Sequence, residues 1–121
     1  MATRLKNQAP LDREKLLEEC DDEQSFANRC LHVFVRCAQE DIDGIAEALH
    51  QSDFAQVVDL AHRLKGASSA IKAEFLRQEA ARLEAFGRKE TLAAVEECFA
   101  RLRAEFDHFK KFIATLPNPN S

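Results

Sequence analysis

Three residues combine types and spacing that could do chemistry together, namely His62, Lys65 and Gly66. They lie in the stretch AHRLKGASSAIKAEF, which begins at Ala61. On a helix, residues three and four positions apart share one face, so the lysine and the glycine lie beside the histidine. A neutral imidazole carries the lone pair of a nucleophile, and a nearby cation can neutralise oxygens of a transferred phosphoryl group. The spacing therefore favours phosphoryl transfer.

Gly66 interrupts a segment whose other residues favour a helix. A glycine inside a helix costs about 0.5 to 1 kcal/mol relative to alanine. Its missing side chain would let the backbone of a partner protein come close to the histidine. On spacing alone, however, His-x-x-Lys-Gly is short enough to arise by chance, so an ordinary surface histidine remains the alternative.

The residues around His62 predict a helix that begins at Phe54, with Ser52 and Asp53 as candidate caps. Its apolar row lies within about 40° of one direction at ~100° per residue. The members of that row are Val57, Ala61, Leu64, Ser68 and Ile71. His62 points about 140° away from the row, so it is expected to face outward.

Two helices are expected before this one. The first is Leu11–Cys20, with Asp21 and Asp22 ending it and capping the next. The second places Phe26, Cys30, Val33 and Cys37 in a buried row, bends at Glu40–Gly44, and resumes with Ile42, Ile45 and Leu49 to about Gln51. Whether it is one kinked helix or two is left open by the spacing.

Two further helices are expected after it. One runs from about Glu74 to Phe86 with Leu76, Ala80 and Leu83 inward, and Gly87 is expected to end it. The last runs from about Glu90 to Leu116, with Leu92, Val95, Phe99, Leu102, Phe106, Phe109 and Ile113 inward. The fold class predicted is all-α, an antiparallel four-helix bundle with a short additional N-terminal helix. It occupies residues 11–116, between a flexible leader, 1–10, and a disordered tail, 117–121.

Composition argues against several partners. The formal net charge of the 121 residues is −4, with acidic and basic residues interleaved, so nucleic acid is not an expected partner. No run approaches the roughly 20 apolar residues of a membrane span, and no signal segment is visible, so a cytoplasmic protein that does not enter the membrane is expected. Narrow apolar rows favour a monomer.

Cysteines and the remaining histidines do not suggest a metal or a disulfide. Cys20, Cys30, Cys37 and Cys98 form no CxxC pair and are expected to be buried, reduced thiols. His32, His50 and His108 fall on separate segments without ligand spacing, so they are expected at the surface and no metal site is expected.

The stretch AHRLKGASSAIKAEFLRQEAARLE, which ends at Glu84, closely resembles the signature of histidine-containing phosphotransfer (HPt) domains, AHxLKGSSANLGAxxLxxxCxxLE. The resemblance implies that His62 is phosphorylated on a ring nitrogen and that Lys65 lies near the phosphoryl group. It also implies that Gly66 clears a docking surface. Glu84 would accept a hydrogen bond from the other ring nitrogen and so orient the ring.

The same resemblance implies a phosphocarrier without kinase or ATPase activity of its own. Such a protein accepts a phosphoryl group from the receiver domain of a hybrid sensor kinase and passes it to the receiver of a response regulator. This chain has no GxxxxGK[ST] motif, so no cofactor is expected on it, and Mg²⁺ is expected on the receiver. By angle, Arg63, Ala67 and Ala70 flank the His62 face and are candidates for receiver docking. The alternative is a helical adaptor that binds receivers without being phosphorylated.

Two positions depart from the family pattern. Ala67 replaces a serine, and Lys72 stands where the family usually turns with glycine. The lysine suggests a longer third helix and adds a positive charge near the docking face. Met1 and the polar tail favour a free-standing protein.

Overall fold

Helix-favouring residues and few turn residues produce five α-helices in the computed structural model, which describes residues 9–116 and has no strand in that range. The helices are α1 Arg13–Glu19, α2 Gln24–His50, α3 Phe54–Ala70, α4 Glu74–Arg88 and α5 Leu92–Ala114. The prediction of an all-α bundle with a short additional N-terminal helix is confirmed. Within the described residues, no helix has the length and apolar character needed to cross a membrane.

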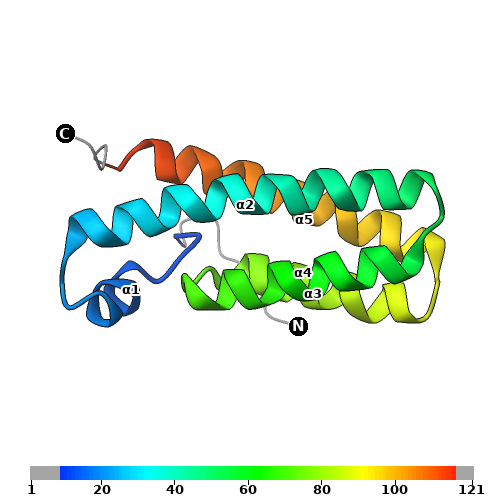
Figure 1. The fold of residues 1–121 in the computed structure, drawn as a ribbon, viewed down its shortest axis with the longest axis horizontal. Coiled ribbons are helices and arrows are strands. Elements are labelled where there is room, and N and C mark those ends of the chain that lie inside the picture. Colours follow the sequence, from blue (N-terminus) through cyan, green and yellow to red (C-terminus); the bar gives the residue numbers. More distant parts are fainter. Residues whose placement is uncertain (1–8, 117–121) are drawn as a thin grey trace.

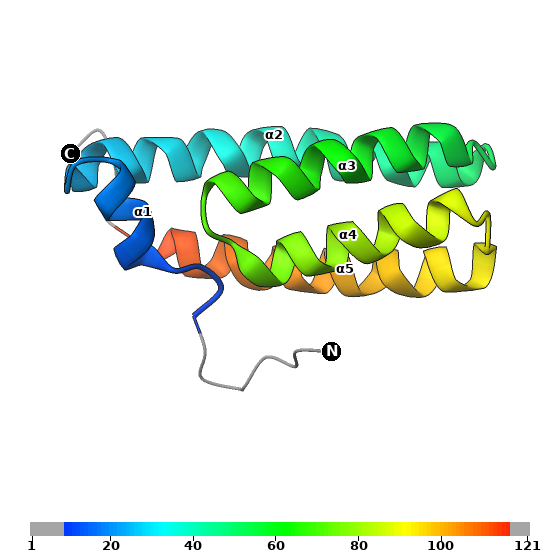
Figure 2. The ribbon, with the colours of Figure 1, turned by 90° about the horizontal axis from the view of Figure 1, so that it is seen from below.

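Helices α2 to α5 run antiparallel to one another in chain order (Figure 1). At 1.5 Å per residue, α2 with 27 residues is about 40 Å long and α3 with 17 residues only about 26 Å. Helix α1 occupies the corner that the shorter α3 and α4 leave open (Figure 2). The N–H of Asp12, its N-cap residue, donates to the carbonyl of Lys72 at 2.9 Å and ties α1 to the α3–α4 turn.

The core is built from the predicted apolar rows of α3, α4 and α5. Its buried residues there include Val57, Ala61, Leu64, Ser68 and Ile71, then Leu76, Ala80 and Leu83, and finally Val95, Phe99, Leu102, Phe106, Phe109 and Ile113. Each fully buried Leu or Phe stabilises the fold by about 1.5–3 kcal/mol. The Phe34 ring packs edge-on against Phe109, with centroids 5.4 Å apart, and joins α2 to α5.

The predicted buried row of α2 is wrong. Phe26, Val33 and Cys37 are exposed and Cys30 is half-buried. The buried row lies one residue further along and comprises Ala27, Leu31, Phe34, Ala38, Ile42 and Ile45. Both rows have helical spacing, but only the buried one continues into Ile42 and Ile45 without a break. Helix α2 runs unbroken through Glu40–Gly44, so of the two alternatives that the spacing left open, two separate helices is wrong.

The two glycines near predicted helix ends lie inside helices. Gly44 is in α2, where an added Cβ would lie 2.8 Å from the Leu60 side chain. Gly87 is buried in α4, where a Cβ would lie 3.0 Å from Cγ2 of Val58, so α4 does not end there as predicted. Glu90, with φ 52°, makes the turn into α5 instead. Close approach of α3 explains both glycines.

Of three other expectations about turns, two are wrong and one is confirmed. Asp21 and Asp22 take left-handed φ values of 52° and 60°, but the N-cap of α2 is Glu23 and no side chain caps that helix. Asp53 caps α3 as predicted, with its side chain accepting from the N–H of Gln56. Lys72 does not extend α3, since it adopts φ 64° in the position where glycine is usual. Its amine pairs with Glu19 of α1 at 2.6 Å.

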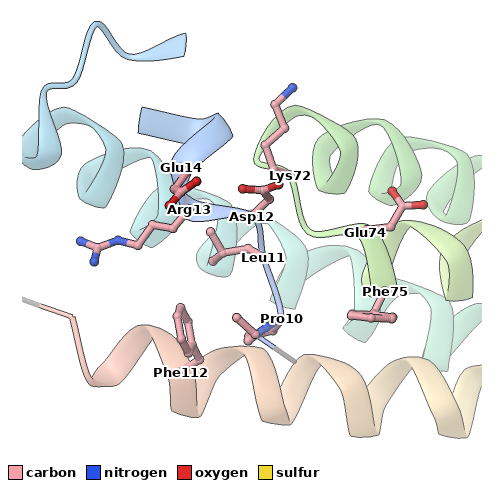
Figure 3. A pocket seen from close by; sticks show the side chains of 10 residues that line it. Pro10, Leu11, Asp12, Arg13, Glu14, Lys72, Glu74, Phe75 and Phe112 are labelled. Carbon is pink, nitrogen blue, oxygen red and sulfur yellow. The ribbon is translucent and has the colours of Figure 1, made fainter. Parts of the chain in front are cut away.

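Pro10 packs against the bundle, one residue before the predicted boundary. It lies near Phe112 in a pocket of about 480 Å³ between α1, α5 and the α3–α4 turn (Figure 3). Ala9 is exposed, and residues 1–8 of the predicted leader and the predicted tail, 117–121, lie outside the described residues. None of the predicted site residues lines this pocket.

The cysteines do not all lie in the core. Cys98 is buried, Cys20 and Cys30 are half-buried and Cys37 is exposed, so the expectation of four buried thiols holds only for Cys98. All four are free. Cys37 is exposed because it belongs to the row of α2 that faces away from the core. Leu92, expected inward, is 45% exposed because it begins α5 at the edge of the bundle.

Candidate functional site: an exposed histidine and a buried carboxylate

Antiparallel packing of α3 on α4 brings His62 and Glu84 together. The distance between Nδ1 of His62 and Oε2 of Glu84 is 3.0 Å. The histidine side chain is 65% exposed, whereas that of the glutamate is only 8% exposed. An ionised carboxylate can only accept, so Nδ1 carries the proton and the lone pair of the neutral ring lies on Nε2. The site is therefore an outward-facing imidazole whose tautomer is set by a carboxylate within the bundle.

Glu84 is held ionised by three cationic or donor groups. Burial alone would raise its pKa, but hydrogen bonds from Lys65, Arg88 and His62 outweigh burial and lower the pKa to about 2. Nζ of Lys65 lies 2.7 Å from Oε1, and a guanidinium nitrogen of Arg88 lies 2.8 Å from Oε2. The carboxylate therefore remains an acceptor for His62 throughout the neutral range.

This lowered pKa predicts a component of acid sensitivity. A carboxylate whose pKa falls from 4.5 to about 2 on folding stabilises the fold above pH 4.5 and loses that contribution as the pH drops toward 2. Urea unfolding of the wild type and of Glu84→Gln, measured between about pH 7 and pH 2, is expected to show a stability difference that shrinks with acidification. A difference that stays constant over this range would contradict the assignment of the charge network.

Arg88 was not found from the sequence. The expected stop at Gly87 placed it in a loop, whereas α4 continues through it. Its spacing of four residues from Glu84 is the signal that a longer helix would have made visible. Both Lys65 and Arg88 therefore lie against the carboxylate that orients His62.

Gly66 faces open space. An added Cβ would meet nothing within 4 Å, in contrast to Gly44 and Gly87. No contact within the described chain requires a glycine at this position. The packing of the bundle therefore does not account for it.

The remaining predicted docking residues lie along the seam between α2 and α3. Ala67 is half-buried and Ala70 is exposed, and both line an apolar groove of about 530 Å³ together with the exposed row of α2. Arg63 lies beyond the groove and is paired with Asp41 of α2, with Nε 3.0 Å from Oδ1. The groove is the part of this face that sequence reasoning missed, because it assigned the wrong row of α2 to the core.

Metal binding finds no support among residues 9–116, where no three His, Cys, Asp or Glu side chains are grouped to hold an ion. His32 and His50 are exposed, and His108 is half-buried on α5. None of them lies with His62 at the contact with Glu84.

The helical bundle with an outward histidine defines a class of protein, and comparison with known families identifies it. The model of the Hpt domain family matches residues 29–112. The chain belongs to this family of histidine phosphotransfer domains, which act in phosphorelays.

Individual relatives agree with that assignment. The phosphorelay intermediate protein RdeA of Dictyostelium discoideum is 22% identical over 103 residues, which are 85% of this chain but 41% of that protein. Among solved structures, histidine-containing phosphotransfer protein B of Pseudomonas aeruginosa matches with a TM-score of 0.79 and 23% identity, over 92% of this chain and 100% of that one. A rice protein described as a histidine-containing phosphotransfer protein gives a TM-score of 0.75 and 22% identity, over 88% and 81%.

Proposed function

We propose that this chain relays a phosphoryl group between receiver-domain aspartates through Nε2 of His62. The observation that carries the proposal is the 3.0 Å contact between Nδ1 and the ionised Glu84. Because Nδ1 is occupied as a donor, the lone pair of Nε2 is available on the exposed side of the ring. Family membership supports the same reaction.

In the proposed step, Nε2 attacks the phosphorus of a receiver's aspartyl phosphate. A phosphorus–nitrogen bond forms while the bond from phosphorus to the aspartate oxygen breaks, and the carboxylate leaves with the electron pair. The ring becomes positively charged, and Glu84 stabilises that charge through its contact with Nδ1. The reverse reaction delivers the group to a second receiver. Mg²⁺ is expected to act from the receiver, so this chain supplies the nucleophile and no kinase or ATPase activity.

Lys65 is proposed to stabilise the phosphoryl group. Its amine uses one contact on Glu84 and has three N–H donors, so two remain for phosphoryl oxygens. Arg88 contacts the same carboxylate, so Glu84 keeps a cationic partner while Lys65 also binds the phosphoryl oxygens. The positive charges of Lys65 and Arg88 thus offset the negative charges of the Glu84 carboxylate and of the incoming phosphoryl group.

Receiver docking is proposed on the face that joins His62, Gly66 and the apolar groove. The groove extends from this face along α2 and α3, where Val33 is 48% exposed. Exposed apolar side chains gathered in one place are typical of protein interaction sites. The partners proposed are the receivers of a hybrid sensor kinase and of a response regulator. We expect a monomer to meet them in the cytoplasm.

Gly66 provides a test of this docking face. Gly66→Ala is expected to stabilise the fold by up to about 1 kcal/mol, because helix propensity improves and the added Cβ meets nothing. Gly66→Leu is expected to fold equally well and to transfer phosphate poorly. Thermal unfolding and transfer rates measured on both variants check this. Normal transfer by Gly66→Leu would show that the glycine is not clearance for a partner.

Val33 and Leu92 form a matched pair for the groove. Each is exposed by nearly half, at 48% and 45%, but Leu92 lies at the start of α5. Val33→Glu is expected to raise the KM for a phosphorylated receiver about tenfold or more, because a charge must be desolvated at the interface. Leu92→Glu should leave it unchanged. Equal effects of the two substitutions would place docking elsewhere.

A direct assay tests the proposed function. The chain is incubated with a purified receiver domain that has been phosphorylated by acetyl phosphate, and transferred label is followed by gel. Acid-labile, alkali-stable phosphate on this chain is the expected product. Binding of the receiver without any label would support the adaptor alternative and overturn the proposal.

A further inference from the structure

Arg63 and Asp41 form a clasp between α3 and α2 next to the phosphoryl-transfer face. Both Nε and Nη2 of the guanidinium contact Oδ1 of Asp41, the first at 3.0 Å. The aspartate side chain is 7% exposed, whereas that of the arginine is 66% exposed. A buried carboxylate thus holds an exposed cation in one orientation.

The clasp leaves most of the guanidinium free to bind a partner. Of its five N–H groups, two are used by Asp41 and three remain. Hydrogen bonding to Asp41, and the charges of Asp41 and nearby Glu40, raise the pKa of Arg63, so it stays charged. A guanidinium that is already held in one orientation loses less conformational entropy when it binds a partner than a mobile one does.

The clasp also stands at one end of the apolar groove. Along the antiparallel seam, Cys37 and Ala67 line the groove, and Asp41 and Arg63 follow them by one helical turn. A second arginine, Arg29, lines the groove and lies over the Phe26 ring at 5.8 Å. The groove therefore has cationic groups at its rim although the whole chain carries a net charge of −4.

We infer that Arg63, oriented by Asp41, is a specificity-determining residue that binds a carboxylate on the receiver surface, other than the phosphorylated aspartate. The inference rests on the proposed function and deepens it, because it names the chemistry that selects one receiver over another. A receiver with an apolar helix face and an acidic residue beside it fits both the groove and its rim. Receivers with a basic residue there are disfavoured by repulsion.

Arg63 could instead serve only to neutralise Asp41, and the double variant Asp41→Asn/Arg63→Gln separates the two roles. Replacing both partners by amides removes the charges together and keeps a hydrogen-bonding pair, so the fold should remain. With a phosphorylated receiver as substrate, this variant is expected to raise KM about tenfold with little change in kcat. Arg103→Gln on α5, which packs on α2 and α4, removes one positive charge from an exposed arginine that does not line the groove and serves as the control.

Ionic strength gives a second readout that needs no variant. Transfer to the wild type is expected to slow as salt rises from about 50 to about 300 mM, and the double variant should lose most of that dependence. Acidic residues on the receiver surface are replaced by lysine one at a time. One of these substitutions should raise the KM with the wild type and leave the KM with the double variant unchanged. A wild type without salt dependence, or a double variant with unchanged KM, overturns the inference. A wild type that takes up no phosphate on His62 instead overturns the proposed function.

Discussion

His62→Gln is expected to take up no acid-labile phosphate from any receiver domain. Glutamine has no ring nitrogen with a lone pair, so the phosphorus–nitrogen bond cannot form. The fold should survive, because the histidine side chain is largely exposed and Glu84 keeps its contacts with Lys65 and Arg88. Transfer of radioactive phosphate, followed on gels next to circular dichroism, measures both outcomes.

His50→Gln is the matched control for this experiment. His50 is an exposed histidine at the end of α2 and should be dispensable. If His62→Gln kept the label and His50→Gln lost it, the phosphoryl group would be carried by His50 and not by His62.

Glu84→Ala is expected to slow phosphoryl transfer about 10–100-fold, the range found when carboxylates that orient metal-ligating histidines are removed. The ring would lose the acceptor at Nδ1, and Lys65 and Arg88 would lose the carboxylate that holds them. Glu84→Gln should retain more activity, since its amide oxygen can still accept from Nδ1. Single-turnover rates at saturating receiver measure the effect on the chemical step, and nitrogen NMR of the imidazole reports the tautomer.

Glu79 offers a control on the same helix. It is also largely buried and has its own arginine partner, Arg82, at 3.0 Å. Glu79→Ala should affect stability without altering the tautomer of His62. If Glu84→Ala transferred phosphate at the wild-type rate, the carboxylate would not be the group that orients the nucleophile.

The fold was largely predictable because apolar spacing determines which side of a helix is buried. Val57, Ala61 and Leu64 form a single row in α3, and the outward direction of His62 follows from it. Helix α2 has two such rows in its first half, and they differ only in that the buried one continues to Ile42 and Ile45. In the structure, α3 and α5 pack on α2, the Phe34 ring contacts Phe109 of α5, and Phe26 and Val33 stay exposed.

The site was predictable only in part, since it joins two helices. Lys65 and Gly66 follow from the face of α3, but the contact of Glu84 with His62 was implied only by family resemblance. Glycine was the misleading signal for Arg88, because Gly87 reads as a helix end when its neighbours on α3 are unknown. The pairing of Asp41 with Arg63 has no signature in either segment alone, because it depends on how α2 and α3 are aligned.

We propose that phosphate is carried on Nε2 of His62 because Nδ1 donates its hydrogen to Glu84. Phosphorus–nitrogen coupling in NMR of the protein labelled with nitrogen-15 in histidine, after transfer from a phosphorylated receiver, identifies the nitrogen that is bonded to phosphorus. We expect coupling to Nε2 of His62 alone, with the proton retained on Nδ1. Coupling to Nδ1, or phosphorus on another residue, would contradict the account.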